Sequence, residues 1–230
     1  MNDIIKILKS SRLFCDLSQE CIRQKLLPQG MVKEYFRHAS VIAPQDYIDW
    51  FGIVLEGRIR IVQMFSDGIS SLMGNLGPAY MLGADLICTK SRRSPYHAIA
   101  DTQVKIFILP GNVLLEPGRL SEPERSQVGQ RLLTLLSHEN MRKHYRLAVL
   151  SRHGLRDRIL VYLTMQAEQK ETRSFYIPFS RDEMADFLCV NRSALSHELS
   201  KMAKEGLIRF HKNHFTLLKS GWDQSLWDFE

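Results

Sequence analysis

One short stretch of the sequence carries hydrogen-bonding and cationic side chains at the spacing of one helix face. These side chains lie between positions 191 and 201: Asn191, Arg192, Ser193, Ser196, His197 and Lys201. Hydroxyl, imidazole, guanidinium and ammonium groups on one face have the chemistry to contact base edges and phosphates in the major groove of DNA. The pattern alone leaves a second interpretation open, in which the face is only the solvated side of a helical hairpin.

Two short helices joined by a tight turn would present this face. Ser180 and Glu183 have the spacing of a capping box, in which each side chain satisfies a backbone N–H group at the start of a helix. This first helix is expected to bury Met184 and Leu188. Its pattern breaks at residues 189–191, which predicts the turn.

The second helix has a cap and a stop signal of its own. Asn191 is a typical N-cap residue, and Gly206 supplies a left-handed stop after about Glu205. The buried stripe is expected at i, i+4 and i+7: Leu195, Leu199 and Met202. The polar face described above lies opposite this stripe, which is the arrangement of a helix-turn-helix motif.

A β-hairpin is predicted after the second helix, where the runs 207–210 and 214–218 flank a turn at Lys212. Lys212 is placed to meet a phosphate, with an exposed solvated turn as the alternative. Ser180 and Arg181, at the start of the first helix, complete the candidate nucleic-acid contacts.

The composition is that of a globular protein, with 44% hydrophobic and 24% charged residues among 230. This length accommodates one large or two modest domains. The net charge is +6, and residues 141–219 hold fifteen Lys and Arg against eight Asp and Glu. The basic surplus therefore coincides with the two-helix segment, which favours a nucleic-acid partner.

No apolar run approaches the eighteen or so residues of a membrane span, and the N-terminal stretch lacks the apolar core of a signal peptide. We therefore expect a cytoplasmic protein with no membrane partner. The four cysteines form no CxxC pair: Cys15, Cys21, Cys88 and Cys189. We expect reduced, mostly buried thiols rather than a zinc site or disulfides.

Upstream, a short helical segment of about thirty residues precedes a region whose period is two. Turn signals at 44–46, 56–57, 67–68 and 77–78 separate strand-like runs: 52–55, 58–65, 69–76 and 104–109. Short strands at this spacing predict an antiparallel barrel or roll.

A long helix is predicted from about Glu124 to about Ser151, and an amphipathic helix from Leu155 to Gln169 follows it. The apolar side of the long helix supplies candidates for a dimer interface: Val128, Leu132, Leu135, Leu136 and Met141. A stripe of this length exceeds what a small barrel can cover, so we expect it to pair with a second copy. Packing along its own domain is the alternative.

From about residue 12 to residue 219 the chain resembles the transcription regulators of the cyclic-AMP receptor protein and fumarate–nitrate-reduction regulator (CRP/FNR) family. The resemblance rests on these segments: Leu13-Phe14 with Leu17-Ser18, Glu56-Gly57-Arg58, Leu76-Gly77-Pro78 leading to Gly83, Ala98 to Thr102, the long helix, and NRSALSHELSKMAKEGLI. The last of these is the most specific.

The resemblance implies an α+β fold and a homodimer that binds double-stranded DNA at a roughly palindromic operator and acts with RNA polymerase. It implies an effector-sensing antiparallel β-roll of the cyclic-nucleotide-binding (jelly-roll) type over residues 1–122 and a dimerisation helix over 123–152. A winged helix-turn-helix follows over 153–219, and 220–230 form a tail.

The effector region of the family maps onto the roll, and its candidate residues are Leu72, Met81, Leu82, Gly83, Ala84, Asp85, Tyr96 and His97. Cyclic-nucleotide-binding members have a glutamate after the glycine and an arginine–serine pair for the phosphate. Here Ala84 follows Gly83, and Ser94-Pro95 align with the pair, with Arg93 one place early. We therefore expect an unidentified small-molecule effector other than cyclic AMP, or none.

Two cofactors of the family are also not expected. The iron–sulfur branch uses four cysteines, three of them closely spaced near the N-terminus, whereas this chain has Cys15 and Cys21 there. A haem needs an axial ligand such as His97 or Cys88. A lone histidine in a barrel is more often a satisfied core or surface group.

The recognition helix departs from the family at two positions. Relatives commonly carry an arginine where His197 stands, and the best-known branch has a glutamate where Ser193 stands. We expect a different half-site to be read, because neutral histidine offers a single donor in place of a bidentate fork. Whether Arg192 contacts a base or a phosphate stays open.

Two other classes of function remain as alternatives. A metal-dependent β-barrel enzyme would need a cluster of ligands, but His38 and His97 are the only histidines in the barrel region. A non-catalytic ligand-binding module that acts through protein contacts would use the two-helix motif as a scaffold.

Overall fold

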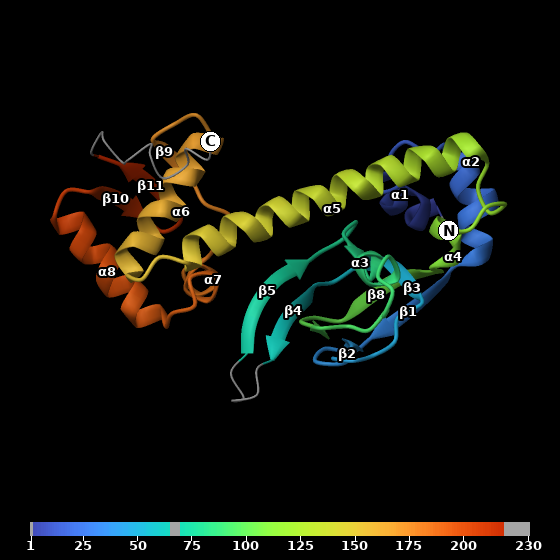
Figure 1. Ribbon diagram of the computed structural model, residues 1–230, viewed down its shortest axis with the longest axis horizontal. Coiled ribbons are helices and arrows are strands. Elements are labelled where there is room, and N and C mark those ends of the chain that lie inside the picture. The colour runs from blue at the N-terminus through green and yellow to red at the C-terminus, as the bar shows by residue number, and fades with distance from the viewer. Residues whose placement is uncertain (1, 65–69, 219–230) are drawn as a thin grey trace. The chain divides into compact units, whose positions relative to one another are not determined.

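The computed structural model describes residues 2–64 and 70–218 (Figure 1). The chain divides into two compact units, Met1–Asn140 and Met141–Glu230. The turn predicted at 67–68 and the tail 220–230 lie outside the described residues. In the part of the chain that is described, every helix is too short or too polar to cross a lipid bilayer.

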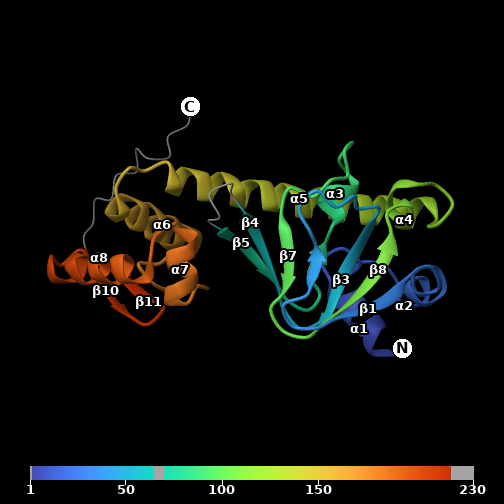
Figure 2. The same ribbon diagram turned by 90° about the horizontal axis from the view of Figure 1, so that it is seen from below.

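Two antiparallel four-stranded sheets form the body of the first unit (Figure 2), with strand orders β1-β8-β3-β6 and β2-β7-β4-β5. The strands are β1 (Met31–Tyr35), β2 (Ser40–Ile42), β3 (Trp50–Glu56), β4 (Ile59–Met64), β5 (Ser70–Leu76), β6 (Met81–Leu82), β7 (His97–Ala100) and β8 (Val104–Pro110). Among the described strands no pairing joins one sheet to the other. The architecture is therefore the predicted roll and not a closed barrel.

Alternation along the strands explains which face of each sheet is inside. Ile59 on β4 is fully buried, whereas its neighbour Arg60 forms an ion pair with Asp101 at 3.1 Å. The turn before β4 needs a glycine, because Gly57 has a φ of +84° and a Cβ there would lie 2.1 Å from the Gln103 carbonyl oxygen. The predicted turn at 56–57 is confirmed.

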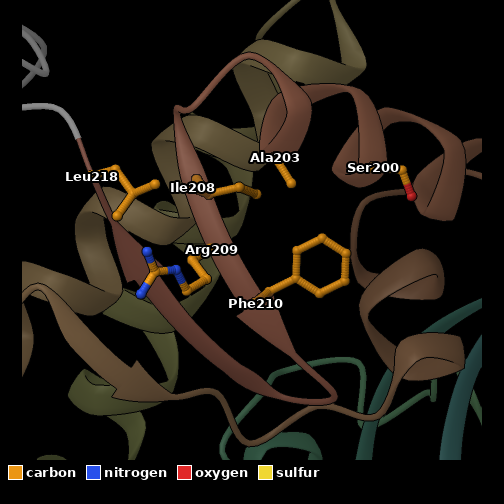
Figure 3. Close-up of a pocket in the computed structure, with 6 residues that line it drawn as sticks. All are labelled: Ser200, Ala203, Ile208, Arg209, Phe210 and Leu218. Atoms are coloured by element: carbon orange, nitrogen blue, oxygen red, sulfur yellow. The ribbon is translucent and has the colours of Figure 1, made fainter.

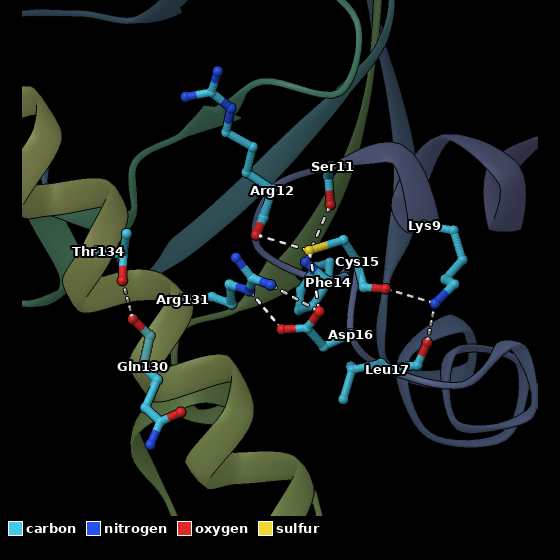
Figure 4. Close-up of polar contacts among 10 residues, drawn as sticks. All are labelled: Lys9, Ser11, Arg12, Phe14, Cys15, Asp16, Leu17, Gln130, Arg131 and Thr134. Carbon is cyan, nitrogen blue, oxygen red and sulfur yellow. Dashed lines mark hydrogen bonds and ion pairs between the residues drawn. The ribbon is translucent and has the colours of Figure 1, made fainter.

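Short helices surround the roll: α1 (Asn2–Ser10), α2 (Gln19–Cys21), η1 (Ile22–Leu26), η2 (Leu27–Gln29), α3 (Ala84–Ile87) and α4 (Asn112–Leu115). Two ion pairs attach the N-terminal segment to the following long helix, α5 (Glu122–Leu150). Asp16 accepts two hydrogen bonds from the Arg131 guanidinium, one of 2.9 Å from Nη2 (Figure 4). Lys25 Nζ lies 2.6 Å from Glu124 Oε2.

Helix α5 begins two residues before the predicted start. Pro123 lies in its first turn, where the missing N–H group has no helical partner in any case. The Ser121 N–H group donates to Glu124 Oε2 at 2.8 Å, and the Ser121 hydroxyl donates to the same oxygen. This is the same S-x-x-E pattern that marked the helix after Ser180, so the sequence contained the signal for this start as well.

The second unit contains α6 (Leu155–Gln169), β9 (Ser174–Tyr176), α7 (Arg181–Phe187), α8 (Arg192–Lys204), β10 (Ile208–His211) and β11 (His214–Leu217), with sheet order β10-β11-β9. The predicted bounds of α6 are confirmed. The core of the second unit is a cluster that includes Leu163, Phe175, Leu195, Leu199 and Phe215. Strand β9 ends at Tyr176.

The expectation of mostly buried thiols is wrong. Cys21 is buried and Cys15 is half-buried, but Cys88 and Cys189 are exposed. Cys88 ends the short helix α3, and Cys189 lies in the turn after α7 with a φ of +55°. Cys88 and Cys189 lie where the chain turns at the surface. Their position in the fold therefore leaves these two thiols exposed.

Candidate nucleic-acid interface

The capping box at Ser180 is confirmed and fixes the start of α7. The Ser180 hydroxyl accepts a hydrogen bond from the Glu183 N–H group at 3.2 Å, and Glu183 Oε2 accepts one from the Ser180 N–H group at 2.8 Å. After the turn, the Asn191 side chain accepts a hydrogen bond from the Ala194 N–H group at 2.7 Å, so Asn191 is the predicted N-cap of α8. The Ser180 cap fixes where α7 begins, and the Asn191 cap fixes where α8 begins after the turn.

Helix α8 presents the predicted polar face to solvent. The expected stripe is fully buried: Leu195, Leu199 and Met202. Ser193, His197 and Lys201 are exposed on the other side, and Ser196 is half-buried among them. The Ser193 hydroxyl donates to Asn191 Oδ1 at 2.8 Å, which leaves only its lone pairs for an outside partner.

Arg192 is exposed at the start of α8 and is engaged with α7. Its Nη1 lies 3.0 and 3.2 Å from the two carboxylate oxygens of Asp182. Both side chains are 65% exposed, so the pair is screened by water and exchanges readily with another anion. Asp182 of α7 therefore lies beside the polar face of α8. The sequence-based prediction had not included this acidic residue.

Arg156 holds α8 against α6, and it was missed at the sequence level. Its Nε donates to Glu198 at 2.7 Å, and its two terminal nitrogens donate to Glu205 at 2.8 and 2.9 Å. Hydrogen bonds to Glu205 and then to Glu198 raise the pKa of the guanidinium. The partners lie more than forty positions away in sequence, so no local pattern could have revealed them.

The hairpin β10–β11 forms the wing beside α8. Its turn contains Lys212, which is exposed with a φ of +52°, and Asn213, whose side chain donates to the Ile177 carbonyl at 3.3 Å. Figure 3 shows Phe210 on the side of β10 that faces α8 and Arg209 on the other side. A shallow hollow there is lined by Ser200, Ala203, Ile208, Arg209, Phe210 and Leu218.

Arg181 does not stand free on the polar face with the other candidates. The side chain is half-buried beneath the wing, and its Nη2 donates to the Lys212 carbonyl at 2.9 Å. The structure therefore leaves the α8 groups and Lys212 at the surface, whereas the Arg181 guanidinium is engaged within the domain.

In the roll, the effector candidates lie on β5, β6, α3 and the start of β7. Leu72 and His97 stand on either side of Val62 in one row across β5, β4 and β7. Met81 and Leu82 form β6, which leads to Gly83 at the start of α3, with a φ of +83°. Ala84 in the first turn of α3 is fully buried.

Two polar candidates are brought together. The Tyr96 hydroxyl donates to Asp85 Oδ1 at 3.2 Å. Burial raises the pKa of Tyr96, and the neighbouring Asp85 carboxylate raises it further. His97 Nε2 lies 2.9 Å from the Ser40 hydroxyl, while its Nδ1 is buried and has no hydrogen-bond partner among the described residues.

The residues aligned with the phosphate-binding pair are used internally. Ser94 is buried, and its hydroxyl donates to the Tyr96 carbonyl at 2.8 Å. Arg93 is exposed, and its Nη1 donates to the Gln45 carbonyl at 2.9 Å. Within the described residues there is no group of three or more His, Cys, Asp or Glu side chains placed to hold a metal ion.

The dimer candidates on α5 divide into two sets. Val128 and Leu132 are buried in the core of their own roll, and Leu135 and Leu136 pack partly against it. Met141 is 48% exposed. The roll thus covers Val128 and Leu132 and packs partly against Leu135 and Leu136, because the helix lies along its own sheets as in the alternative interpretation. Met141 stays open to a partner. Leu133, which the sequence-based prediction left out, is 68% exposed.

Comparison with known proteins agrees with the division of the chain into an N-terminal roll and a C-terminal helix-turn-helix unit. Residues 32–116 match the family model of the cyclic nucleotide-binding domain, and residues 157–220 match that of the Crp-like helix-turn-helix domain. The nitrogen fixation regulation protein FixK of Rhizobium meliloti (strain 1021) is 27% identical over 179 residues, which cover 77% of this chain and 78% of that protein.

The transcriptional activator protein FnrL of Cereibacter sphaeroides is 24% identical over 200 residues, 82% of this chain and 77% of that protein. Among solved structures, the c-di-GMP responsive global regulator CLP of Xanthomonas campestris has the same fold, with a TM-score of 0.63 at 18% identity over 88% of this chain and 100% of that one. With an effector-binding roll followed by a Crp-like helix-turn-helix, the chain belongs to the CRP/FNR family of DNA-binding transcription regulators.

Proposed function

We propose that this regulator binds duplex DNA as a homodimer and that the exposed face of α8 reads each half-site. The observation that carries the proposal is the polar face itself, fixed by two side-chain caps and by the Arg156 contacts. The face comprises Arg192, Ser193, Ser196, His197 and Lys201. Lys212 in the wing turn supplies a phosphate contact.

A seam on α5 supports the homodimer. Gly129, Leu133, Leu136 and Asn140 are spaced by four, three and four residues, which is the heptad spacing of a coiled coil. Leu136 also packs partly against its own roll, so it borders both surfaces. A Cβ at Gly129 would meet nothing within 4 Å, so this part of the helix is open to close approach. Asn140 occupies a seam position where a polar residue fixes the register of two helices.

Family membership supports the remaining partners. CRP/FNR regulators bind DNA and act as dimers with RNA polymerase, and the family consists of regulators and not enzymes. For this chain we infer the same partners, a cytoplasmic site of action and no catalytic activity.

The effector is inferred to be a small molecule other than cyclic AMP. Ala84 offers no carboxylate for a ribose, Ser94 is bonded within the roll, and Arg93 is engaged at the surface. Among the described effector candidates, His97 Nδ1 is a buried polar atom without a hydrogen-bond partner, which gives a ligand one hydrogen-bonding group beside Leu72 and Val62. We also propose that the roll holds no iron–sulfur cluster, because the four cysteines are dispersed, and no haem, because His97 Nε2 is engaged with the Ser40 hydroxyl.

Selection of binding sites from random duplexes tests the function. We expect enrichment of an inverted repeat, and a His197→Ala variant should lose base preference at one position of each half-site. Lys6→Ala, an exposed substitution on α1, is the control. Failure to enrich any sequence would favour the non-catalytic module, and one firmly bound metal ion per chain would favour the enzyme.

A further inference from the structure

Arg181 occupies an unusual place for a cation at the edge of a DNA-binding face. Its guanidinium carbon lies 5.2 Å from the ring centroid of Phe210 and 5.6 Å from that of Phe215. These two rings, on paired strands of the wing, are stacked with their centroids 5.7 Å apart. The cation therefore covers the aromatic base of the wing and is held by both of its strands.

The same guanidinium is bonded to the tip of the hairpin. Its Nη2 donates to the Lys212 carbonyl at 2.9 Å, and its Nη1 contacts Met184 Sδ at 3.7 Å on α7. Burial lowers the pKa of Arg181, with a further lowering from the nearby Arg192 guanidinium. Arg181 thus links the first helix of the motif to the wing turn.

The wing turn is anchored on its other side as well. The Asn213 side chain donates to the Ile177 carbonyl at 3.3 Å, and the Ile177 N–H group donates to the Asn213 carbonyl at 2.9 Å. Lys212 itself has a φ of +52°, a conformation that a non-glycine residue adopts only when its surroundings favour it. The Arg181 bond to its carbonyl is such a constraint.

We propose that Arg181 is a positioning residue that sets the wing turn and so directs Lys212 to a phosphate, and that it does not itself contact DNA. This inference rests on the proposed function. An arginine is required because its planar fork can lie over the rings while it donates to the carbonyl; a lysine keeps the charge but has no planar group to lie over the rings.

The salt dependence of DNA binding separates positioning from direct contact. Each phosphate neutralised contributes about 0.9 to the slope of log K against log salt. The proposed homodimer has two wings, so we expect Lys212→Ala to lower the slope by about two, one for each subunit, and Arg181→Lys to lower it by a similar amount although the charge is kept. The double variant should show little further change, because both substitutions remove the same contact.

Direct contact predicts a different pattern. Arg181→Lys would then keep the wild-type slope, Arg181→Gln would lower it, and the loss would add to that of Lys212→Ala; this result would overturn the proposal. Phe210→Leu provides a second variant, because it removes an aromatic ring beneath Arg181 without changing any charge. A slope lowered by about one per subunit, as in Lys212→Ala, supports positioning, and an unchanged slope contradicts it.

A measurement without DNA distinguishes failure of this inference from failure of the proposed function. Trypsin cleaves after Lys212 only when the turn opens locally, so cleavage there should be several-fold faster in Arg181→Lys than in wild type. Cleavage after Arg173, in the loop before β9, is the internal control. Equal rates of cleavage after Lys212 in the variant and in wild type would contradict the positioning role, whether or not the protein binds DNA.

Discussion

The face of α8 and the effector region of the roll differ in how far their polar groups are already used. On α8, His197 and Lys201 are exposed, and the Arg192 contact with Asp182 is an exposed pair that another anion can replace. In the roll, Asp85 is bonded to Tyr96, and Ser94 to the backbone beside it. The face of α8 is open to a partner, whereas most polar groups of the effector region are satisfied within the fold.

The two regions also differ in how they are assembled. Consecutive turns of one helix place every residue of the DNA face, so their relative positions follow from helix geometry. The effector region brings together residues from different strands. Which side chains lie next to one another there depends on the register of the strands. A substitution on α8 should therefore act on one contact, whereas one in the roll disturbs several.

The strongest test asks whether the α8 face is sufficient by itself. Leu133→Asp places a charge in the α5 seam, and we expect it to dissociate the dimer and raise Kd for an inverted repeat by about a hundredfold. Sedimentation and fluorescence anisotropy measure the two effects. Thr134→Asp, one position along and 100° around the helix, is the matched control. Unchanged assembly in Leu133→Asp would mean that one α8 face acts alone or that another surface pairs the subunits.

His197→Arg sharpens the view of α8 as a set of separate contacts. Arginine can donate two hydrogen bonds to guanine O6 and N7, so selected half-sites should gain a guanine, with affinity for them raised by about tenfold. Binding-site selection and titration of the selected duplexes measure this. An unchanged base preference would place His197 away from the base edges.

Tyr96→Phe probes the satisfied state of the effector region. The substitution leaves Asp85 without the hydroxyl donor, and we expect the free energy of unfolding to fall by about 1 kcal/mol. Urea unfolding of the wild type and the variant measures the loss, with Tyr47→Phe as an exposed control. If stability does not change, the Tyr96–Asp85 bond contributes nothing and the region is as open as α8.

The smallest effect is expected where the N-terminal segment meets α5. Burial alone would raise the pKa of Glu124, but hydrogen bonds from Lys25 and Ser121 outweigh it and lower the pKa from 4.5 to about 2. A lowered pKa stabilises the folded state above the unfolded-state value, and the stabilisation is lost as pH falls from about 4.5 to about 2.

Glu124→Gln should therefore cost about 0.5 kcal/mol at pH 7, since glutamine retains part of the cap while the ion pair is lost. The difference from wild type should vanish toward pH 2. Urea unfolding between pH 2 and pH 7 measures it. A gap that stays constant over this range would show that the charge of Glu124 does not stabilise the fold.

Sequence reasoning succeeded where a signal was local. The caps at Ser180 and Asn191, the stop at Gly206 and the stripe of α8 all depend on residues within one or two turns. The start of α5 after Ser121 has the same capping pattern, and the predicted start at about Glu124 did not use it. The family and its fold followed from the same local segments.

It failed where tertiary packing decided the outcome. The apolar period of α5 does not distinguish the side that packs on its own roll from the side that would face a partner. Val128 and Leu132 were predicted to face a partner, but they are buried in the core of the roll. Arg181 and Arg156 are cations on helix starts, and only the fold shows that their guanidinium groups are engaged by the wing and by α8. Strands of two to five residues, such as β6 and β1, contain too few residues to show a period.

The hydrogen bond from Ser193 to Asn191 gives the DNA face a fixed polarity at one point. A serine hydroxyl normally rotates to suit either a donor or an acceptor, which makes it a permissive contact. With its proton held by the helix cap, Ser193 can accept but not donate. In a DNA complex we expect the amino groups of adenine and cytosine to be favoured opposite Ser193 over the carbonyl oxygens of guanine and thymine, so a residue without a charge would select for exocyclic amines.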